Sequence, residues 1–118
     1  MSTKKQHNKS IKSIPREDLL GMVTGVFRTL GDTTRANILY SLQKNELSVK
    51  ALSELTGVSQ SAVSHQLSYL RKRQFVIARK DGNIVFYSLR YKHLSVLLKE
   101  AEYYAEHVKQ NLPDHPYT

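Results

Sequence analysis

Residues 59–72 read SQSAVSHQLSYLRK and form the most informative stretch of the chain. Val63, Leu67 and Leu70 recur at helical spacing and give one apolar stripe. The opposite side carries short side chains that can hydrogen-bond to base edges in a DNA major groove, and the cations at the end can neutralise phosphates. The candidate DNA contacts are Ser59, Gln60, Ser61, Ser64, His65, Ser68, Arg71 and Lys72. A helix that is merely solvated would more often carry Glu and Lys at these positions.

A shorter helix is expected directly before this one, over residues 49–56. Ser48 is a typical N-cap residue for it, and Gly57 a typical C-terminal stop. Gly57 and Val58 then form the turn, and Ser59 caps the next helix. Two helices joined by a short turn that contains glycine are typical of a helix-turn-helix.

Two further helices are expected upstream. The first begins near Pro15 and stops at Gly31, because proline favours helix starts and glycine favours helix ends. Its apolar side chains are Leu19, Leu20, Met22, Val23, Val26, Phe27 and Leu30. The second is capped by Asp32 or Thr33 and directs Ile38, Leu39 and Leu42 inward.

A β-hairpin is expected after the helix-turn-helix. Residues 75–80 and 84–89 are rich in β-branched and aromatic side chains, and Asp81-Gly82 between them is a turn signal. The side chains at its tip are Arg79, Lys80 and Asn83, of which the cations can reach phosphate. The alternative is a solvated tip that contacts nothing. A long helix is expected at roughly residues 92–109. The predicted fold is therefore mainly α with a β-hairpin wing. It is a winged helix-turn-helix in which four helices are followed by two strands and then by a last helix.

The charge balance supports a nucleic-acid partner. Lys and Arg number 18 against 10 Asp and Glu, for a formal charge of +8 over 118 residues. We expect a flexible basic tail at residues 1–14, one domain at 15–110 and a C-terminal tail at 111–118. No apolar run is long enough to cross a membrane and no signal peptide is evident, so a cytoplasmic protein with no membrane partner is expected.

The chain resembles the ArsR/SmtB family of metal-responsive bacterial repressors over about residues 18–110. The segments that carry the resemblance are residues 27–35 (FRTLGDTTR), 52–55 (LSEL), 61–67 (SAVSHQL) and 79–89 (RKDGNIVFYSL). The resemblance implies a winged-helix homodimer. It also implies that the dimer represses by occupying double-stranded operator DNA and dissociates when an effector binds.

The absence of cysteine narrows the effector that the resemblance implies. Members of the family sense arsenic, cadmium or lead, and also persulfides, through cysteines, whereas zinc, nickel and cobalt are sensed through nitrogen and oxygen ligands. This chain therefore resembles the last group, or a member that senses no metal. Imidazole suits these borderline ions. The histidines are His7, His65, His93, His107 and His115, of which His65 is assigned to DNA and His7 to the tail, with recruitment of His7 as a ligand left open.

His93 and His107 are 14 residues apart, which places them on nearly the same helix face but about 21 Å apart along the axis. One helix cannot chelate an ion with both. If two copies cross antiparallel near Glu100, His93 of one subunit meets His107 of the other, as in the family's C-terminal-helix site. The apolar seam expected to join the copies is Leu94, Leu97, Leu98, Ala101 and Ala105.

The remaining ligands follow from the same resemblance. The family's four-ligand zinc pattern is incomplete, because Tyr91 and Tyr104 occupy two of its ligand positions. The nickel- and cobalt-sensing branch fits better, since it has a His at the helix start, an adjacent Glu-His near the end and a further His after a tail that contains proline. The metal ligands implied here are His93, Glu106, His107 and His115. Nickel or cobalt is the expected effector, with zinc as a further option.

Three alternatives stay open at this point. His93 could be an ordinary core or cap residue, His107 a solvated helix-end residue and His115 a tail residue. In that case the protein is a winged-helix regulator that senses no metal. The chain could also be a basic protein-interaction module that binds no specific duplex. An enzyme is not expected, because no Ser-His-Asp order, glycine-rich phosphate loop or carboxylate pair stands out.

Overall fold

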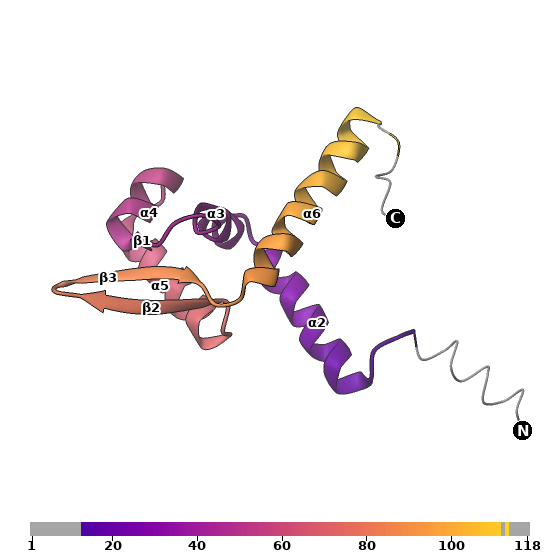
Figure 1. Cartoon of the computed structure of the whole chain (residues 1–118), viewed down its shortest axis with the longest axis horizontal. Helices are drawn as coiled ribbons and strands as arrows, with labels where there is room; N and C mark the ends of the chain where they lie inside the picture. Colours follow the sequence, from indigo (N-terminus) through magenta and orange to yellow (C-terminus); the bar gives the residue numbers. More distant parts are fainter. Residues whose placement is uncertain (1–12, 112, 114–118) are drawn as a thin grey trace, which may run out of the picture.

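The structure is a computed structural model that describes residues 13–111 and 113. In chain order its elements are α2 (Glu17–Leu30), α3 (Thr33–Ser41), β1 (Leu47–Ser48), α4 (Val49–Thr56), α5 (Gln60–Lys72), β2 (Val76–Asp81), β3 (Ile84–Leu89) and α6 (Lys92–Gln110). Figure 1 shows α3, α4 and α5 beside the hairpin, while α2 and α6 extend away from the end opposite its tip. The expected winged helix-turn-helix is confirmed. The tail residues 1–12, 112 and 114–118 lie outside the described part.

The helix ends follow the local signals in the sequence. The Asp32, Ser48 and Ser59 side chains each accept a hydrogen bond from the backbone N–H three residues later, at 3.0, 3.1 and 3.2 Å. These bonds satisfy amide groups that have no partner inside the helix. Gly57 ends α4 with φ of +74°, a left-handed conformation that glycine adopts without strain.

The hairpin turn lies one residue later than the sequence suggested. Asp81 pairs with Ile84, so β2 includes Asp81 and the turn residues are Gly82 and Asn83. Gly82 has φ of +62°, which suits a two-residue hairpin turn. The strand β1, which the sequence analysis missed, pairs antiparallel with β3 and gives the sheet order β1-β3-β2.

The core joins the helix-turn-helix to the first half of α6. Its buried apolar residues are Ile38, Leu39, Leu42, Leu52, Val63, Leu67, Leu70, Val76, Leu94 and Leu98. The Tyr40 hydroxyl also donates to the Leu98 backbone oxygen at 2.6 Å and ties α3 to α6. The expected intersubunit seam was therefore wrong in part, because Leu94 and Leu98 pack inside their own subunit and Leu97 packs against that core.

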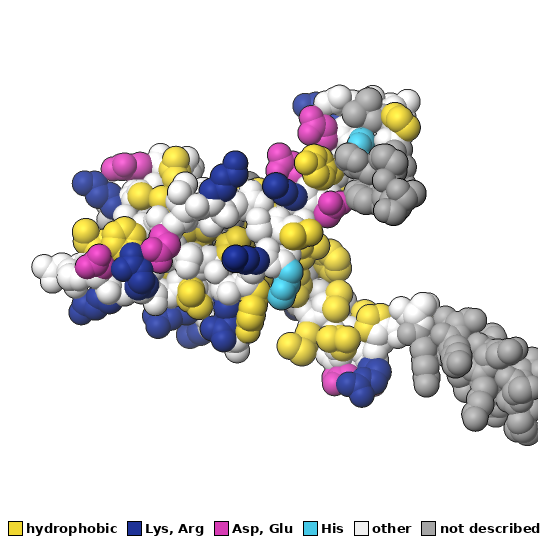
Figure 2. All heavy atoms as spheres, viewed as in Figure 1, with side chains coloured by type: hydrophobic (Ala, Val, Ile, Leu, Met, Phe, Trp, Pro, Cys, Tyr) yellow, Lys and Arg dark blue, Asp and Glu magenta, His cyan; other side chains and the backbone are white. Residues whose placement is uncertain are grey.

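Other apolar side chains of α2 and α6 are exposed in the single chain. They are Leu19, Leu20, Met22 and Phe27 on α2, and Val96, Tyr103, Tyr104 and Val108 on α6. Met22 is 72% exposed and Tyr104 74%. Figure 2 shows hydrophobic side chains gathered where Figure 1 places α2. Within the described residues, no helix is long and apolar enough to span a membrane.

Candidate nucleic-acid interface and metal site

The recognition helix α5 is held rigidly against α4. Val63, Leu67 and Leu70 are fully buried, which fixes the rotation of α5 about its own axis. At the turn, the Ser53 hydroxyl donates to the Val58 backbone oxygen at 2.6 Å, and the Val58 N–H donates to the Thr56 hydroxyl at 3.3 Å. The polar face of α5 is therefore directed away from the core by packing and by the turn.

The candidate DNA contacts on this helix all lie on its exposed side. These residues are Ser59, Gln60, Ser61, Ser64, His65, Ser68, Arg71 and Lys72. Ser59 is also the N-cap, so one lone pair of its hydroxyl is already used by the Ala62 N–H. Figure 2 shows Lys and Arg side chains along the lower edge of the molecule, on the side where Figure 1 places α5. A polar face flanked by cations can contact both bases and phosphates.

Two arginines that the sequence analysis did not single out meet at the end of α5. The Arg73 guanidinium carbon lies 3.4 Å from the centroid of the Tyr69 ring, and that of Arg35 lies 4.4 Å from it. Arg35 also donates to the Thr29 backbone oxygen at 2.9 Å, which ties α3 to the end of α2. Arg35 therefore has a structural role. The 34-residue separation between Arg35 and Tyr69 gives no local sequence signal for this contact.

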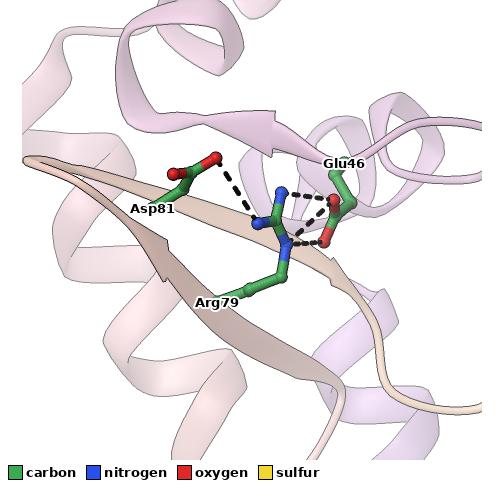
Figure 3. Close-up of polar contacts among 3 residues, drawn as sticks. All are labelled: Glu46, Arg79 and Asp81. Carbon is green, nitrogen blue, oxygen red and sulfur yellow. Dashed lines mark hydrogen bonds and ion pairs between the residues drawn. The ribbon is translucent and has the colours of Figure 1, made fainter.

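Arg79 is held within the subunit and not at the wing tip. Its guanidinium donates three hydrogen bonds to the Glu46 carboxylate at 2.9, 3.0 and 3.2 Å, and it lies 3.8 Å from the Asp81 carboxylate (Figure 3). It also lies 5.1 Å from the Phe86 ring centroid. The hydrogen bonds and the charge of Glu46 raise the Arg79 pKa, and the hydrogen bonds from Arg79 lower the Glu46 pKa.

The two predicted wing cations point to opposite faces of the hairpin. Side chains alternate along a strand, so Lys80 shares a face with the buried Val76, and Arg79 lies on the other. The strand β2 packs against α5, and Val76 belongs to the core that contains the buried side of α5. Lys80 therefore lies on the sheet face nearer the recognition helix, whereas Arg79 braces β2 to the segment before β1. Contact of either residue with DNA stays a prediction.

The predicted metal ligands do not meet in one chain. His93 is in the first turn of α6, where its ring stacks on Tyr91 with 5.4 Å between centroids. His107 is in the last turn and half-buried, and the exposed Glu106 accepts a hydrogen bond from Gln110 at 3.0 Å. Among the described residues, no three His, Cys, Asp or Glu side chains are grouped as a metal site. His7 and His115 lie outside the described residues.

His93 borders a cavity of about 520 Å³ between α2, the turn after α5 and α6. Its apolar lining includes Met22, Val26, Phe75 and Leu97. His93 therefore lies next to the exposed apolar side chains of α2. A ligand at His93 would act on the part of the molecule where α2 and α6 meet.

Comparison with known proteins identifies the family. The sequence profile described as "Bacterial regulatory protein, arsR family" matches residues 32–78, which include α3, α4 and α5. The HTH-type transcriptional regulator KmtR of Mycobacterium tuberculosis is 38% identical, over 84% of this chain and 76% of its own. The HTH-type transcriptional regulator NmtR of the same organism is 40% identical, over 80% and 79%.

A solved structure shows the same architecture in a dimer. The homodimeric winged helix-turn-helix DNA-binding domain from Mycobacterium bovis superposes with a TM-score of 0.74 and 26% identity, over 83% of this chain and 91% of that one. Proteins of this kind are transcriptional regulators, so the expectation that the chain is not an enzyme is confirmed. The chain belongs to the arsR family of bacterial regulatory proteins and is a DNA-binding transcriptional regulator.

Proposed function

We propose that the protein is a repressor that leaves its operator when a divalent metal ion binds between the α6 helices of its two subunits. The effector is nickel or cobalt, with zinc as a further option, and the ligands are His93, Glu106, His107 and His115. The protein acts in the cytoplasm, where bacterial operator DNA lies. The observation that carries the proposal is the placement of two imidazoles at opposite ends of one 19-residue helix.

The geometry of α6 supports a site shared by two chains. His93 and His107 lie on nearly the same face of the helix, about 21 Å apart along its axis. In an antiparallel crossing about a two-fold axis near Glu100, each His93 approaches the partner's His107, which gives two equivalent sites. The exposed Tyr104 and Val108 on α6 are apolar surface that such a crossing can cover.

The donor chemistry supports a borderline ion. Imidazole and carboxylate ligands suit nickel, cobalt and zinc, and the chain has no cysteine to favour softer ions. Four such donors together with Asp114 or a water give the five or six ligands that nickel and cobalt accept. Stacking on Tyr91 holds the ring plane of His93, which lowers the cost of ordering that ligand.

The packing offers a route from the metal to DNA. The α6 helix is bonded to α3 through Tyr40 and Leu98, and α3 shares its core with α5. A shift of one α6 against the other therefore moves the recognition helices, which must span successive major grooves about 34 to 36 Å apart. The coupling between ion and operator is typically about 1 to 3 kcal/mol and acts equally in both directions.

Titration of the full-length protein with nickel, cobalt and zinc tests this proposal, with operator affinity as the readout. His93→Ala and His107→Ala should each leave metal-free operator binding intact and abolish release by the ion, because each removes a donor from both sites. His115→Ala should have a graded effect if the tail closes over the ion. His7→Ala is the matched control, since it removes an imidazole that is not a predicted ligand.

Two outcomes would contradict the proposal. If none of the three ions changes operator affinity of the wild type, the protein is a winged-helix regulator that senses no metal. If the double variant His93→Ala, His107→Ala still binds an ion and still releases DNA in response, the sensing ligands lie elsewhere.

A further inference from the structure

A second cavity, of about 590 Å³, lies on a different part of the subunit. Three segments form it: residues 42–46 after α3, residues 88–90 at the end of β3, and one face of α6. The α6 residues are Lys92, Ser95, Val96 and Lys99, which are spaced as one side of a helix. Its volume falls in the range of small-molecule sites, roughly 300 to 1,000 Å³.

The lining of this cavity is strongly cationic. Lys44, Arg90, Lys92 and Lys99 line it, and Glu46 is the only acidic residue among the described residues that do so. The Glu46 carboxylate already accepts three hydrogen bonds from Arg79, so its charge is compensated by a cation that is not part of the lining. A concave surface lined by charges of one sign concentrates the field and attracts ions of the opposite sign.

Neutral groups in the same cavity add hydrogen-bonding capacity and an apolar wall. Ser88, Ser95 and Asn45 are polar lining residues, and Leu42, Leu89 and Val96 are apolar ones. The Gln43 amide donates to the Ser95 backbone oxygen at 3.3 Å, which joins the loop after α3 to α6. A ligand that fits this lining has several anionic oxygens on a short apolar scaffold.

We propose that this cavity binds a small multivalent oxyanion, with phosphate or carboxylate groups that contact Lys44, Arg90, Lys92 and Lys99. None of the lining residues is a candidate DNA contact or metal ligand, so the cavity is distinct from both of those sites. Charge-assisted hydrogen bonds hold the anion, and Leu89 and Val96 contact its apolar part. Because the cations lie at an open rim, binding weakens as the salt concentration rises.

Isothermal titration calorimetry of the metal-free, full-length protein tests the site without DNA. The probes are inorganic pyrophosphate and citrate, which distinguish phosphate from carboxylate recognition. We expect saturable binding of one anion per chain for at least one probe. Lys92→Gln and Lys99→Gln should each weaken it about tenfold, the effect of removing one charge-assisted hydrogen bond. Both side chains are exposed, and thermal unfolding checks that the variants fold.

Lys50→Gln is the matched control, because Lys50 is an exposed cation on α4 that does not line the cavity. It should bind the anion as the wild type does. Any of three calorimetric outcomes overturns the proposal: neither probe binds the wild type, the cavity variants bind as tightly as the wild type, or Lys50→Gln loses as much affinity as they do. Cavity variants that change only the salt dependence of DNA binding would make the cavity a site for the DNA backbone, which also overturns it.

Discussion

The helices α5 and α6 differ in how much of their apolar surface one chain covers. In α5 the apolar residues at helical spacing are fully buried and the exposed side is polar. In α6 only Leu94 and Leu98 are buried, at 8% and 2% exposure, and both belong to the first half of the helix. From residue 99 onwards every described residue of α6 is exposed except the half-buried His107. One chain therefore buries the apolar side of α5, in the DNA-reading half of the molecule. It leaves much of the apolar surface of the other half, α2 and α6, exposed.

The exposed apolar side chains on α2 and on the second half of α6, which lie outside the cavity lined by Val96, indicate what covers that part of the molecule. Apolar patches of this kind mark interaction surfaces more often than ordinary solvated surface. The chain belongs to a family with homodimeric winged-helix members, so a second copy is the expected cover. In such a dimer the recognition helix would need the partner only for its spacing on DNA, whereas α2 and α6 would need it to bury their apolar side chains.

The largest expected effect comes from Met22→Asp on α2. Met22 is 72% exposed, so the substitution costs the isolated subunit little, but it places a charge twice in the expected two-fold interface. We expect dimer affinity to fall by at least about a hundredfold. Sedimentation should show monomers, and operator binding should fall with dimerisation.

Leu55→Asp is the control for this variant. Leu55 is 65% exposed on α4, so the change in charge and polarity is the same but lies in the half that one chain completes. It should leave the dimer intact. If Met22→Asp stays dimeric, or if both variants dissociate alike, the contrast between the two halves is wrong.

The second effect concerns the polar face of α5. Ser64→Ala combined with His65→Ala should weaken specific operator binding by roughly 1 to 3 kcal/mol for each well-formed hydrogen bond to a base that is removed. The melting temperature should stay unchanged, because both side chains are exposed. The measurement compares affinity for an operator selected from random duplexes with affinity for unrelated DNA. Unchanged discrimination between the two would mean that α5 does not read the sequence.

Much of the fold could be predicted because its signals are local. Ser48, Gly57 and Ser59 act within one helical turn, and each has the capping role that its residue type favours. The short strand β1 could not be predicted, since two residues carry no periodic pattern. It forms because Leu47 reaches Tyr87, 40 residues away. The bond from Arg79 to Glu46 is nonlocal for the same reason.

The candidate sites divide in a similar way. Periodicity correctly placed five polar residues on the exposed side of α5, because only one core is available to cover the other side: Gln60, Ser61, Ser64, His65 and Ser68. On α6 the same periodicity could not tell which neighbour covers Leu94 and Leu98, the subunit's own core or the partner. The metal ligands stay a prediction, since His93 and His107 come together only between two chains.

A smaller effect is expected at the link between the two halves. The Tyr40 hydroxyl donates to the Leu98 backbone oxygen, so Tyr40→Phe should lower the free energy of unfolding by about 1 kcal/mol. Burial and the charge of Glu102 raise the Tyr40 pKa, so the neutral phenol is the favoured form. Its contribution is present below the ordinary tyrosine pKa of about 10 and is lost as pH rises through the raised value. Urea unfolding from pH 8 to 11 measures it, and a constant difference between variant and wild type across that range would contradict this role.

The smallest effect concerns the wing. There Arg79 joins β2 to Glu46 before β1, and Lys80 is the candidate phosphate contact. Lys80→Gln should reduce the salt dependence of DNA binding by the equivalent of about one phosphate per subunit, whereas Arg79→Gln should leave it unchanged. Arg79→Gln and Glu46→Gln should lower the melting temperature slightly and equally, and the double variant should be no less stable than either single one. An equal decrease of salt dependence in Arg79→Gln and Lys80→Gln would instead place both cations on DNA.

The pH dependence of the brace gives an independent check. The hydrogen bonds from Arg79 lower the pKa of Glu46, although partial burial opposes this shift. A carboxyl group with a lowered pKa stabilises the fold above its ordinary pKa of about 4.3, and this contribution is lost as pH falls through the lowered value. The difference in melting temperature between the wild type and Glu46→Gln should therefore be constant from pH 7 to about 5 and disappear in more acidic solution. A difference that persists after Glu46 is protonated would have to arise from packing around the Phe86 ring and not from the ion pair.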